Sequence, residues 1–175
     1  MVWSPASEAC AWGTLGHSEH ARESIGRAER AWDQVRPDEL DEMGGIAMFT
    51  RPRQLHFAAS ALIWLPDGFT TAADYAQQAV DAYSNPTDPV WSFAGAAGSR
   101  AVLAIARIRN AEVEGAADAL APVLDLPVEL RINGIVQSVN HVHRALNDVP
   151  ASATSRGLQE RIESYSLTPA RALAR

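Results

Sequence analysis

The histidines of this chain do not form the spacings that metal binding requires. His17 and His20 lie three residues apart, but a helix start predicted at Ser18 separates them. His141 and His143 lie two residues apart, so they point in different directions on a helix. With no cysteine pair and no HExxH motif to complete a zinc site, the sequence predicts neither a bound metal nor a cofactor.

Two acidic clusters, within residues 39–42 and 112–118, contain carboxylates that could do acid–base chemistry. Such chemistry needs a cleft that shifts the carboxyl pKa values, and nothing in these segments implies one. The sequence also has no nucleophile-elbow motif and no glycine-rich phosphate loop. We therefore interpret both clusters as solvated helix faces and predict no catalytic residues.

Polar side chains at helical spacing form a more informative pattern. Three predicted helices carry such a stripe, and each would be the first helix of a helical hairpin. In arrays of the tetratricopeptide-repeat (TPR) type, the first helices line the concave surface. The candidate groove residues are Arg53, His56, Ser60 and Trp64 on the helix from Arg51; Ser92, Ser99, Arg100 and Arg107 on the helix from Pro89; and Asn133, Gln137, Asn140 and Arg144 on the helix from Pro127.

These residue types suit the recognition of a peptide or a small ligand. Asn and Gln amides can hold a peptide backbone, and Arg can hold a carboxylate through two parallel hydrogen bonds. Trp64 and Trp91 are candidate aromatic anchors of the same groove. The alternative is that the stripes are ordinary solvated helix faces and that both tryptophans belong to the core.

The elements that would position these residues are helices throughout, with no strand pattern. Serine, threonine and aspartate before proline mark several helix starts, and Pro122 should kink or shorten the helix that contains it. A short acidic helical turn is expected within residues 37–43, and residues 167–175 should form a flexible tail. The expected helices cover residues 4–15, 18–35, 51–65, 71–84, 89–109, 112–126 and 127–148, and a last helix begins at Ser152 or Thr154 and ends at about Tyr165.

Taken in pairs, these helices give four antiparallel hairpins. A faint internal repeat supports their stacking, because Ala28 and Trp32 are matched 51 residues later by Ala79 and Tyr83. The interval exceeds the 34 residues of a strict TPR. We predict a single all-α domain over residues 1–175, with TPR-like hairpins stacked in a right-handed superhelix. A compact helical bundle is the alternative.

Composition narrows the classes of function. The chain has 175 residues, of which 47% are hydrophobic and 21% charged, as expected for a folded globular protein. Its net charge of −6 argues against nucleic acid binding by this chain. Cys10 is the only cysteine, which excludes an intramolecular disulfide. No signal peptide is apparent and no apolar run reaches the roughly 20 residues of a membrane span, so a soluble cytoplasmic protein is expected.

Several longer strings carry a family resemblance: DELDEMGGI, HFAASALIWL, AADYAQQAVDAY, WSFAGAAGSRAVLAIARI and EGAADALAPVLDLPVELRINGIVQSVNHVHRAL. In this order, over about residues 12–172, they resemble the C-terminal TPR-like region of actinobacterial helix-turn-helix transcriptional regulators of the XRE type. The resemblance implies a sensing or dimerising role and no catalytic residues. The sequence shows no DNA-reading domain ahead of Ser4, so we expect either a regulatory fragment or a stand-alone relative without the DNA-binding half. The resemblance therefore implies regulation rather than direct operator binding.

Three functional hypotheses remain open at this point. The first is a sensor or protein-interaction module that binds a peptide, a protein segment or a small ligand in a concave groove. The second is a purely structural homodimerisation domain that uses an apolar patch on a terminal hairpin. The third is an enzyme of unrecognised type, which would need several titratable groups converging in a deep pocket.

Overall fold

The computed structural model describes residues 3–34 and 49–167. These residues form eight α-helices and one 3₁₀ turn, with no strand among them, which confirms the all-α prediction. The predicted acidic turn at 37–43 and nearly all of the predicted tail lie outside the described residues. The elements are α1 (Trp3–Thr14), α2 (Ser18–Asp33), α4 (Arg51–Leu62), α5 (Phe69–Ala82), α6 (Phe93–Arg109), α7 (Val113–Leu124), η2 (Val128–Leu130), α8 (Asn133–Leu146) and α9 (Ala153–Leu167).

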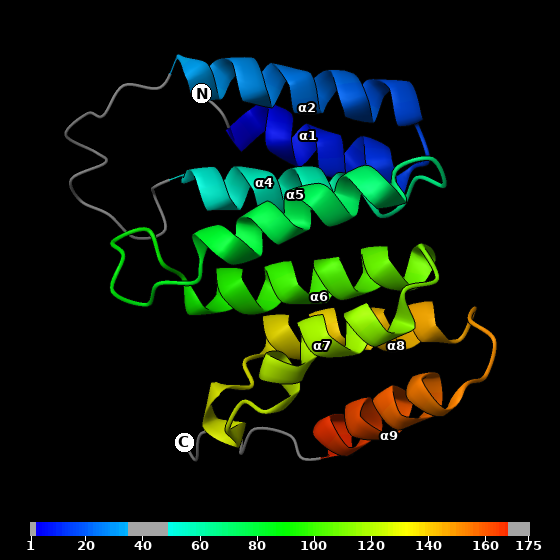
Figure 1. Ribbon diagram of the computed structural model, residues 1–175. Coiled ribbons are helices and arrows are strands. Elements are labelled where there is room, and N and C mark those ends of the chain that lie inside the picture. Colours follow the sequence, from blue (N-terminus) through cyan, green and yellow to red (C-terminus); the bar gives the residue numbers. More distant parts are fainter. Residues whose placement is uncertain (1–2, 35–48, 168–175) are drawn as a thin grey trace.

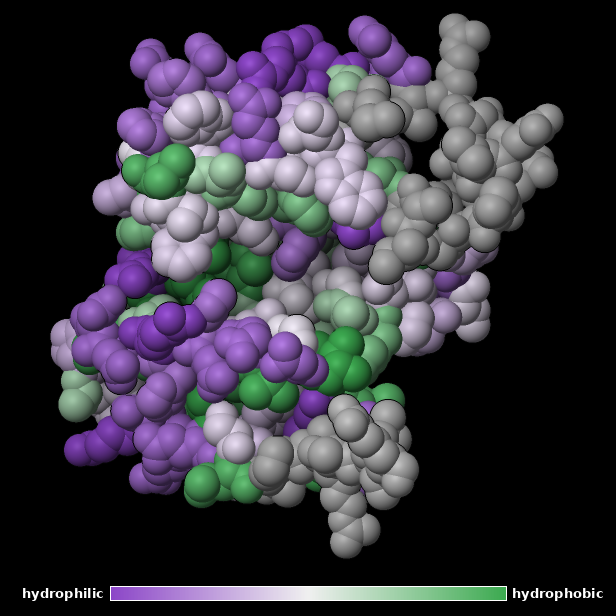
Figure 2. Space-filling model, turned by 180° about the vertical axis from the view of Figure 1, so that it is seen from behind, coloured by the Kyte–Doolittle hydropathy of each residue, from purple (hydrophilic) through white to green (hydrophobic). Residues whose placement is uncertain are grey.

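The helices pair as hairpins, and the hairpins stack in chain order from α1 and α2 to α8 and α9 (Figure 1). The first helices also contact one another in succession, α1 with α4, α4 with α6 and α6 with α8. In Figure 1, α5 passes in front of α4, and α7 in front of α8. Helices α4 and α8 therefore lie toward the side shown in Figure 2, where a hollow with hydrophobic residues on its floor separates the upper part of the molecule from the lower part.

Small side chains allow these helices to approach closely. Ala59, Ala72 and Ala76 are completely buried at the helix contacts. The closest approach is at Gly13 in α1, where a Cβ atom would lie 2.2 Å from the carbonyl oxygen of Ala61 in α4. The crossing of α1 and α4 therefore requires glycine at this position.

Helix α6 lies at the centre of the stack. It contacts α4, α5, α7 and α8, and every residue from Ala101 to Ala106 is buried. This middle segment of α6 is apolar on all sides, which is typical of a helix segment in a protein interior. The described residues contain no helix that is both long and apolar enough to cross a membrane.

Two predicted helix starts are confirmed in atomic detail. The Thr50 hydroxyl accepts a hydrogen bond from the Arg53 amide at 3.4 Å, with proline in the first turn of α4. The Ser152 hydroxyl accepts one from the Ser155 amide at 3.0 Å. Both hydroxyls satisfy amides that the first turn of a helix leaves without an intrahelical partner.

The helix predicted to begin at Pro89 begins at Phe93 instead, so this prediction was wrong. Ser92 caps the helix through its hydroxyl, while Asp88 caps only the turn that precedes it. Trp91 consequently lies in the loop between α5 and α6 rather than on a helix.

The helix predicted from Pro127 is also interrupted. It divides into η2 and α8, because Arg131 leaves helical geometry and its side chain donates to the Leu126 carbonyl at 3.0 Å. Ile132 lies just before α8 and is 47% exposed. The apolar residues on one side of α8 are buried: Ile135, Val139, Val142 and Leu146.

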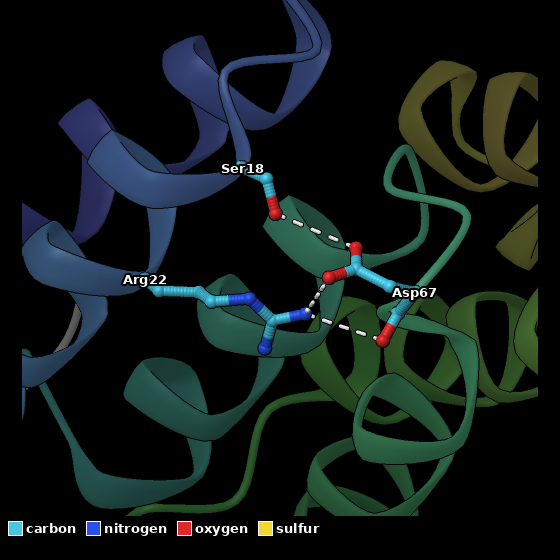
Figure 3. Close-up of polar contacts among 3 residues, drawn as sticks. All are labelled: Ser18, Arg22 and Asp67. Atoms are coloured by element: carbon cyan, nitrogen blue, oxygen red, sulfur yellow. Dashed lines mark hydrogen bonds and ion pairs between the residues drawn. The ribbon is translucent and has the colours of Figure 1, made fainter.

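Polar contacts connect the first two hairpins at the edge of the stack (Figure 3). Arg22 of α2 donates to the Asp67 carboxylate at 2.9 Å and to its carbonyl oxygen at 3.2 Å. The Ser18 hydroxyl donates to the same carboxylate at 3.4 Å. Asp67 belongs to the turn between α4 and α5, so these contacts hold that turn against the start of α2.

Candidate functional site

A pocket of about 580 Å³ opens between the first half of α4, the α5–α6 loop and the start of α6. The polar and aromatic side chains that line it come from the start of α4 and from the α5–α6 loop, while α6 contributes Ala94 and Gly95. The polar groups among the described residues are Thr50, Arg53, His56, Tyr83 and Ser92, and the larger apolar ones are Phe57, Val90 and Trp91.

Aromatic rings surround the guanidinium group of Arg53. The group lies 4.3 Å from the ring centroid of Trp3, 5.8 Å from that of Phe49 and 6.0 Å from that of Phe57. Attraction between the cation and these rings stabilises the guanidinium at the wall of the pocket.

His56 lies against α6. Its Nδ1 atom is 3.3 Å from the hydroxyl oxygen of Ser99, which is fully buried. The ring fits because residue 98 is glycine, where a Cβ atom would lie 3.3 Å from the His56 Cε1 atom. Burial, and to a smaller extent the charge of Arg53, lowers the pKa of His56 to about 4, so the imidazole is neutral at pH 7.

Tyr83 forms another part of the wall, immediately after α5. Its side chain lies so close to α6 that a Cβ atom at Gly95 would be 2.7 Å from its hydroxyl oxygen. Burial raises the pKa of Tyr83, so its hydroxyl is protonated at pH 7. Gly95 thus makes room for the phenol ring between α5 and α6.

The structure brings Arg53, His56 and Trp91 together in this pocket. Ser60 lies on α4 beyond the pocket, but α4 ends at Leu62, so Trp64 lies in the turn after the helix and not on the helix as predicted. Trp64 is 49% exposed, and its ring centroid lies 6.4 Å from that of His141 on α8. Trp64 is therefore not a core residue, and it contacts α8 from the turn after α4.

The two arginines predicted on α6 lie elsewhere. Arg107 donates to the side chain of Gln77 on α5 at 3.0 Å and to the Gly115 carbonyl on α7 at 2.8 Å. Arg100 lies two turns earlier, so it shares that side of α6. Both face the second helices of the hairpins, which corrects their predicted place in a groove of first helices.

The stripe on α8 does not reach the pocket either. Asn133, Gln137 and Arg144 are exposed on α8, and Asn140 accepts a weak hydrogen bond from Ser166 of α9 at 3.5 Å. None of the four lines the pocket at α4. The predicted groove residues are thus divided between a pocket, an exposed surface and the opposite side of α6.

Sequence reasoning missed Tyr83 as a residue of the site. The sequence analysis used Tyr83 only as part of the internal repeat; its side chain is buried and also lines the pocket. The only available signal was its position next to a loop with two prolines, Pro86 and Pro89, which prevents the helix from continuing over the opening.

Within residues 3–34 and 49–167, no group of three or more His, Cys, Asp or Glu side chains could hold a metal ion. Comparisons with protein-family models, curated proteins and solved structures give no match. The geometry of the pocket is therefore the basis on which a function can be argued.

Proposed function

We propose that this chain is a ligand-binding module whose binding site is the pocket between α4 and α6. One observation carries the proposal: Arg53 and His56 from α4 and Tyr83 and Trp91 from the α5–α6 loop converge on one cavity. Its volume of about 580 Å³ lies within the range typical of small-molecule sites, about 300–1,000 Å³. A mainly apolar wall with a few polar groups is also typical of such sites.

A sensing role in transcription regulation fits both this site and the resemblance to XRE-type regulators. The pocket lies between the second and third hairpins, because α4 belongs to one and α6 to the other. A ligand that contacts both hairpins would favour the arrangement in which those contacts are best. Binding would then shift the population of conformations rather than drive any chemistry.

Native mass spectrometry of the protein purified from its own host tests this proposal. We expect a mass excess from one retained small molecule, and we expect it to disappear in Arg53→Ala. Arg100→Ala is the matched control, because Arg100 lies on the side of α6 that faces α5 and α7, away from the pocket. Equal loss of the ligand in both variants would contradict the site.

A fragment screen by NMR covers the case in which the ligand is lost during purification. At least one fragment class should shift the resonances of pocket residues such as Tyr83 and Trp91. If no fragment of any charge does so, the binding function is refuted. A dimer mass under the same conditions would then favour the homodimerisation hypothesis.

A further inference from the structure

One atom at the wall of the pocket, Nε2 of His56, has no hydrogen-bond partner among the described residues. We propose that the pocket selects a planar, uncharged ligand whose carbonyl oxygen accepts a hydrogen bond from the Nε2–H group of His56. Ser99 is a positioning residue, because its hydroxyl fixes the tautomer in which this donor exists. The assignment rests on the binding function proposed above and adds the class of ligand.

The tautomer follows from the surroundings of Ser99. Its side chain is fully buried, and His56 Nδ1 is the only hydrogen-bond partner of its hydroxyl among the described residues. If Nδ1 carried the proton, the hydroxyl hydrogen of Ser99 would be buried without an acceptor, which is unfavourable. Nδ1 is therefore the acceptor. Because a neutral imidazole carries a single N–H group, the proton of His56 lies on Nε2.

The Nε2 atom is accessible from the pocket. In the part of the chain that the structure describes, the buried side-chain atoms without a hydrogen-bond partner are His143 Nε2 and Tyr165 Oη, so His56 Nε2 is not enclosed in this way. Gly98 helps to keep it accessible, since a Cβ atom there would lie 3.8 Å from Nε2 and 3.3 Å from Cε1. His56 lines the pocket, and its Nε2–H group therefore lies open to the cavity as a donor.

A neutral donor in this position favours an uncharged acceptor. The imidazole of His56 is neutral at pH 7. A ketone or amide oxygen that leaves water to meet it exchanges one neutral hydrogen bond for another. A carboxylate would lose the hydration of a full charge, which a single neutral N–H group does not replace. Phe57, Tyr83 and Trp91 provide aromatic surface for the planar remainder of the ligand.

The tautomer can be measured directly by ¹⁵N NMR of histidine-labelled protein at pH 7. We expect His56 to carry its proton on Nε2 alone, with Nδ1 showing the chemical shift of a hydrogen-bonded acceptor. Ser99→Ala should add a measurable share of the Nδ1–H tautomer. A purely structural role of Ser99 would change stability without changing the tautomer. Finding the proton on Nδ1 in the wild type would overturn the inference.

Three probes of similar shape test the class of ligand. 2-Acetylnaphthalene has the carbonyl group, 2-isopropenylnaphthalene has a CH₂ group in place of the oxygen, and 2-naphthoate is charged. We expect NMR titration to show the ketone binding at least about fivefold more tightly than the alkene, as the net contribution of one neutral hydrogen bond implies. The ketone should also bind more tightly than the carboxylate. Equal affinities of ketone and alkene, or tighter binding of the carboxylate, would refute the assignment.

Variants of His56 separate the donor from the shape of the pocket. His56→Phe keeps a ring but removes the N–H group, so the ketone should lose its advantage over the alkene while the alkene still binds. His141→Phe is the matched control, because His141 is exposed on α8 and does not line the pocket. This control should leave the advantage of the ketone unchanged. Equal loss of that advantage in both variants would contradict donation by His56.

The fragment screen described above distinguishes failure of this ligand class from failure of the binding function. Every carbonyl-bearing fragment that binds should shift the Nε2 resonance of His56, whether or not a naphthalene probe fits. If the only fragments that bind lack a carbonyl group, or if they leave Nε2 unchanged, the ligand class is wrong and the pocket remains a binding site. If no fragment binds, the proposed function is refuted as well.

Discussion

Replacing Gly13 with alanine should destabilise the protein, although alanine is normally the better helix former. The reason is the crossing of α1 and α4, where the new Cβ atom would lie 2.2 Å from the carbonyl oxygen of Ala61 and 2.9 Å from its carbonyl carbon. Both atoms belong to the backbone, so no side-chain rotation can relieve the contact. The two helices would have to separate by roughly 1 Å to restore an ordinary van der Waals distance of 3.4 Å.

The size of the effect follows from two opposing contributions. Alanine in place of glycine stabilises a helix by about 0.5–1 kcal/mol. Overpacking of a close-packed interior costs about 1–3 kcal/mol, and a backbone clash belongs at the upper end of that range or beyond it. We expect a net loss of about 2 kcal/mol in the free energy of unfolding, or a decrease in Tm of about 4–8 °C for a chain of this length.

Gly26→Ala is the matched control. Gly26 lies in α2, and the nearest atom to a Cβ there is the terminal Nη1 of the Arg30 side chain at 3.4 Å. This variant should gain about 0.5–1 kcal/mol, because no backbone atom opposes the helix propensity of alanine. Urea unfolding followed by circular dichroism measures both variants. If Gly13→Ala is as stable as the wild type, the reasoning about the α1–α4 crossing is refuted.

Three further perturbations have defined outcomes. Arg131→Ala removes hydrogen bonds to the carbonyls of Leu126 and Tyr165 and a guanidinium–ring contact of 4.2 Å with Tyr165. Hydrogen exchange should therefore accelerate more for the amides of α9 than for those of α1. An equal acceleration in both helices would contradict this. The hydrogen bond from Arg22 lowers the pKa of Asp67 in the folded protein. The Asp67 carboxylate therefore stabilises the fold at pH values above the pKa that it has in the unfolded chain. This stabilisation is lost as the pH falls through the lower pKa of the folded protein. The wild type should therefore lose more stability than Asp67→Asn between about pH 4 and about pH 2, and equal losses would argue against the pair. Burial raises the pKa of Cys10 to about 11, so little of the reactive thiolate is present at pH 8. Alkylation by iodoacetamide at this pH should be more than about 100-fold slower in the native protein than in urea. Mass spectrometry can measure both rates.

Local signals explain why much of the fold could be predicted. Thr50 and Ser152 cap the helices that follow them because capping depends on residues within one turn. The buried positions of α8 follow the same logic, since the helical period alone places Ile135, Val139 and Val142 on one side.

The α5–α6 loop shows where local signals stop being sufficient. Asp88 and Ser92 are both good helix caps, and each is followed by residues that can continue a helix. The structure uses Ser92, which leaves Trp91 free to line the pocket. Choosing between two caps four residues apart requires knowledge of the tertiary packing, which the sequence does not display.

The side of α6 that carries its arginines could not be predicted for a related reason. The helical period alone places Arg100 and Arg107 on one side of α6, and they share that side in the structure. It did not determine whether this side faces the first helices or the second helices of the hairpins. The contacts of Arg107 with Gln77 and Gly115 determine it, and all of these depend on neighbouring helices.

The central position of α6 also limits how the chain could change its length. Repeat arrays commonly gain or lose terminal units, because each unit contacts only its neighbours. Here α4 and α8 both pack on α6, whose residues 101–106 are all buried. Removing either flanking hairpin would uncover part of this apolar segment, so we expect the described residues to unfold cooperatively and to tolerate no deletion of a hairpin next to α6.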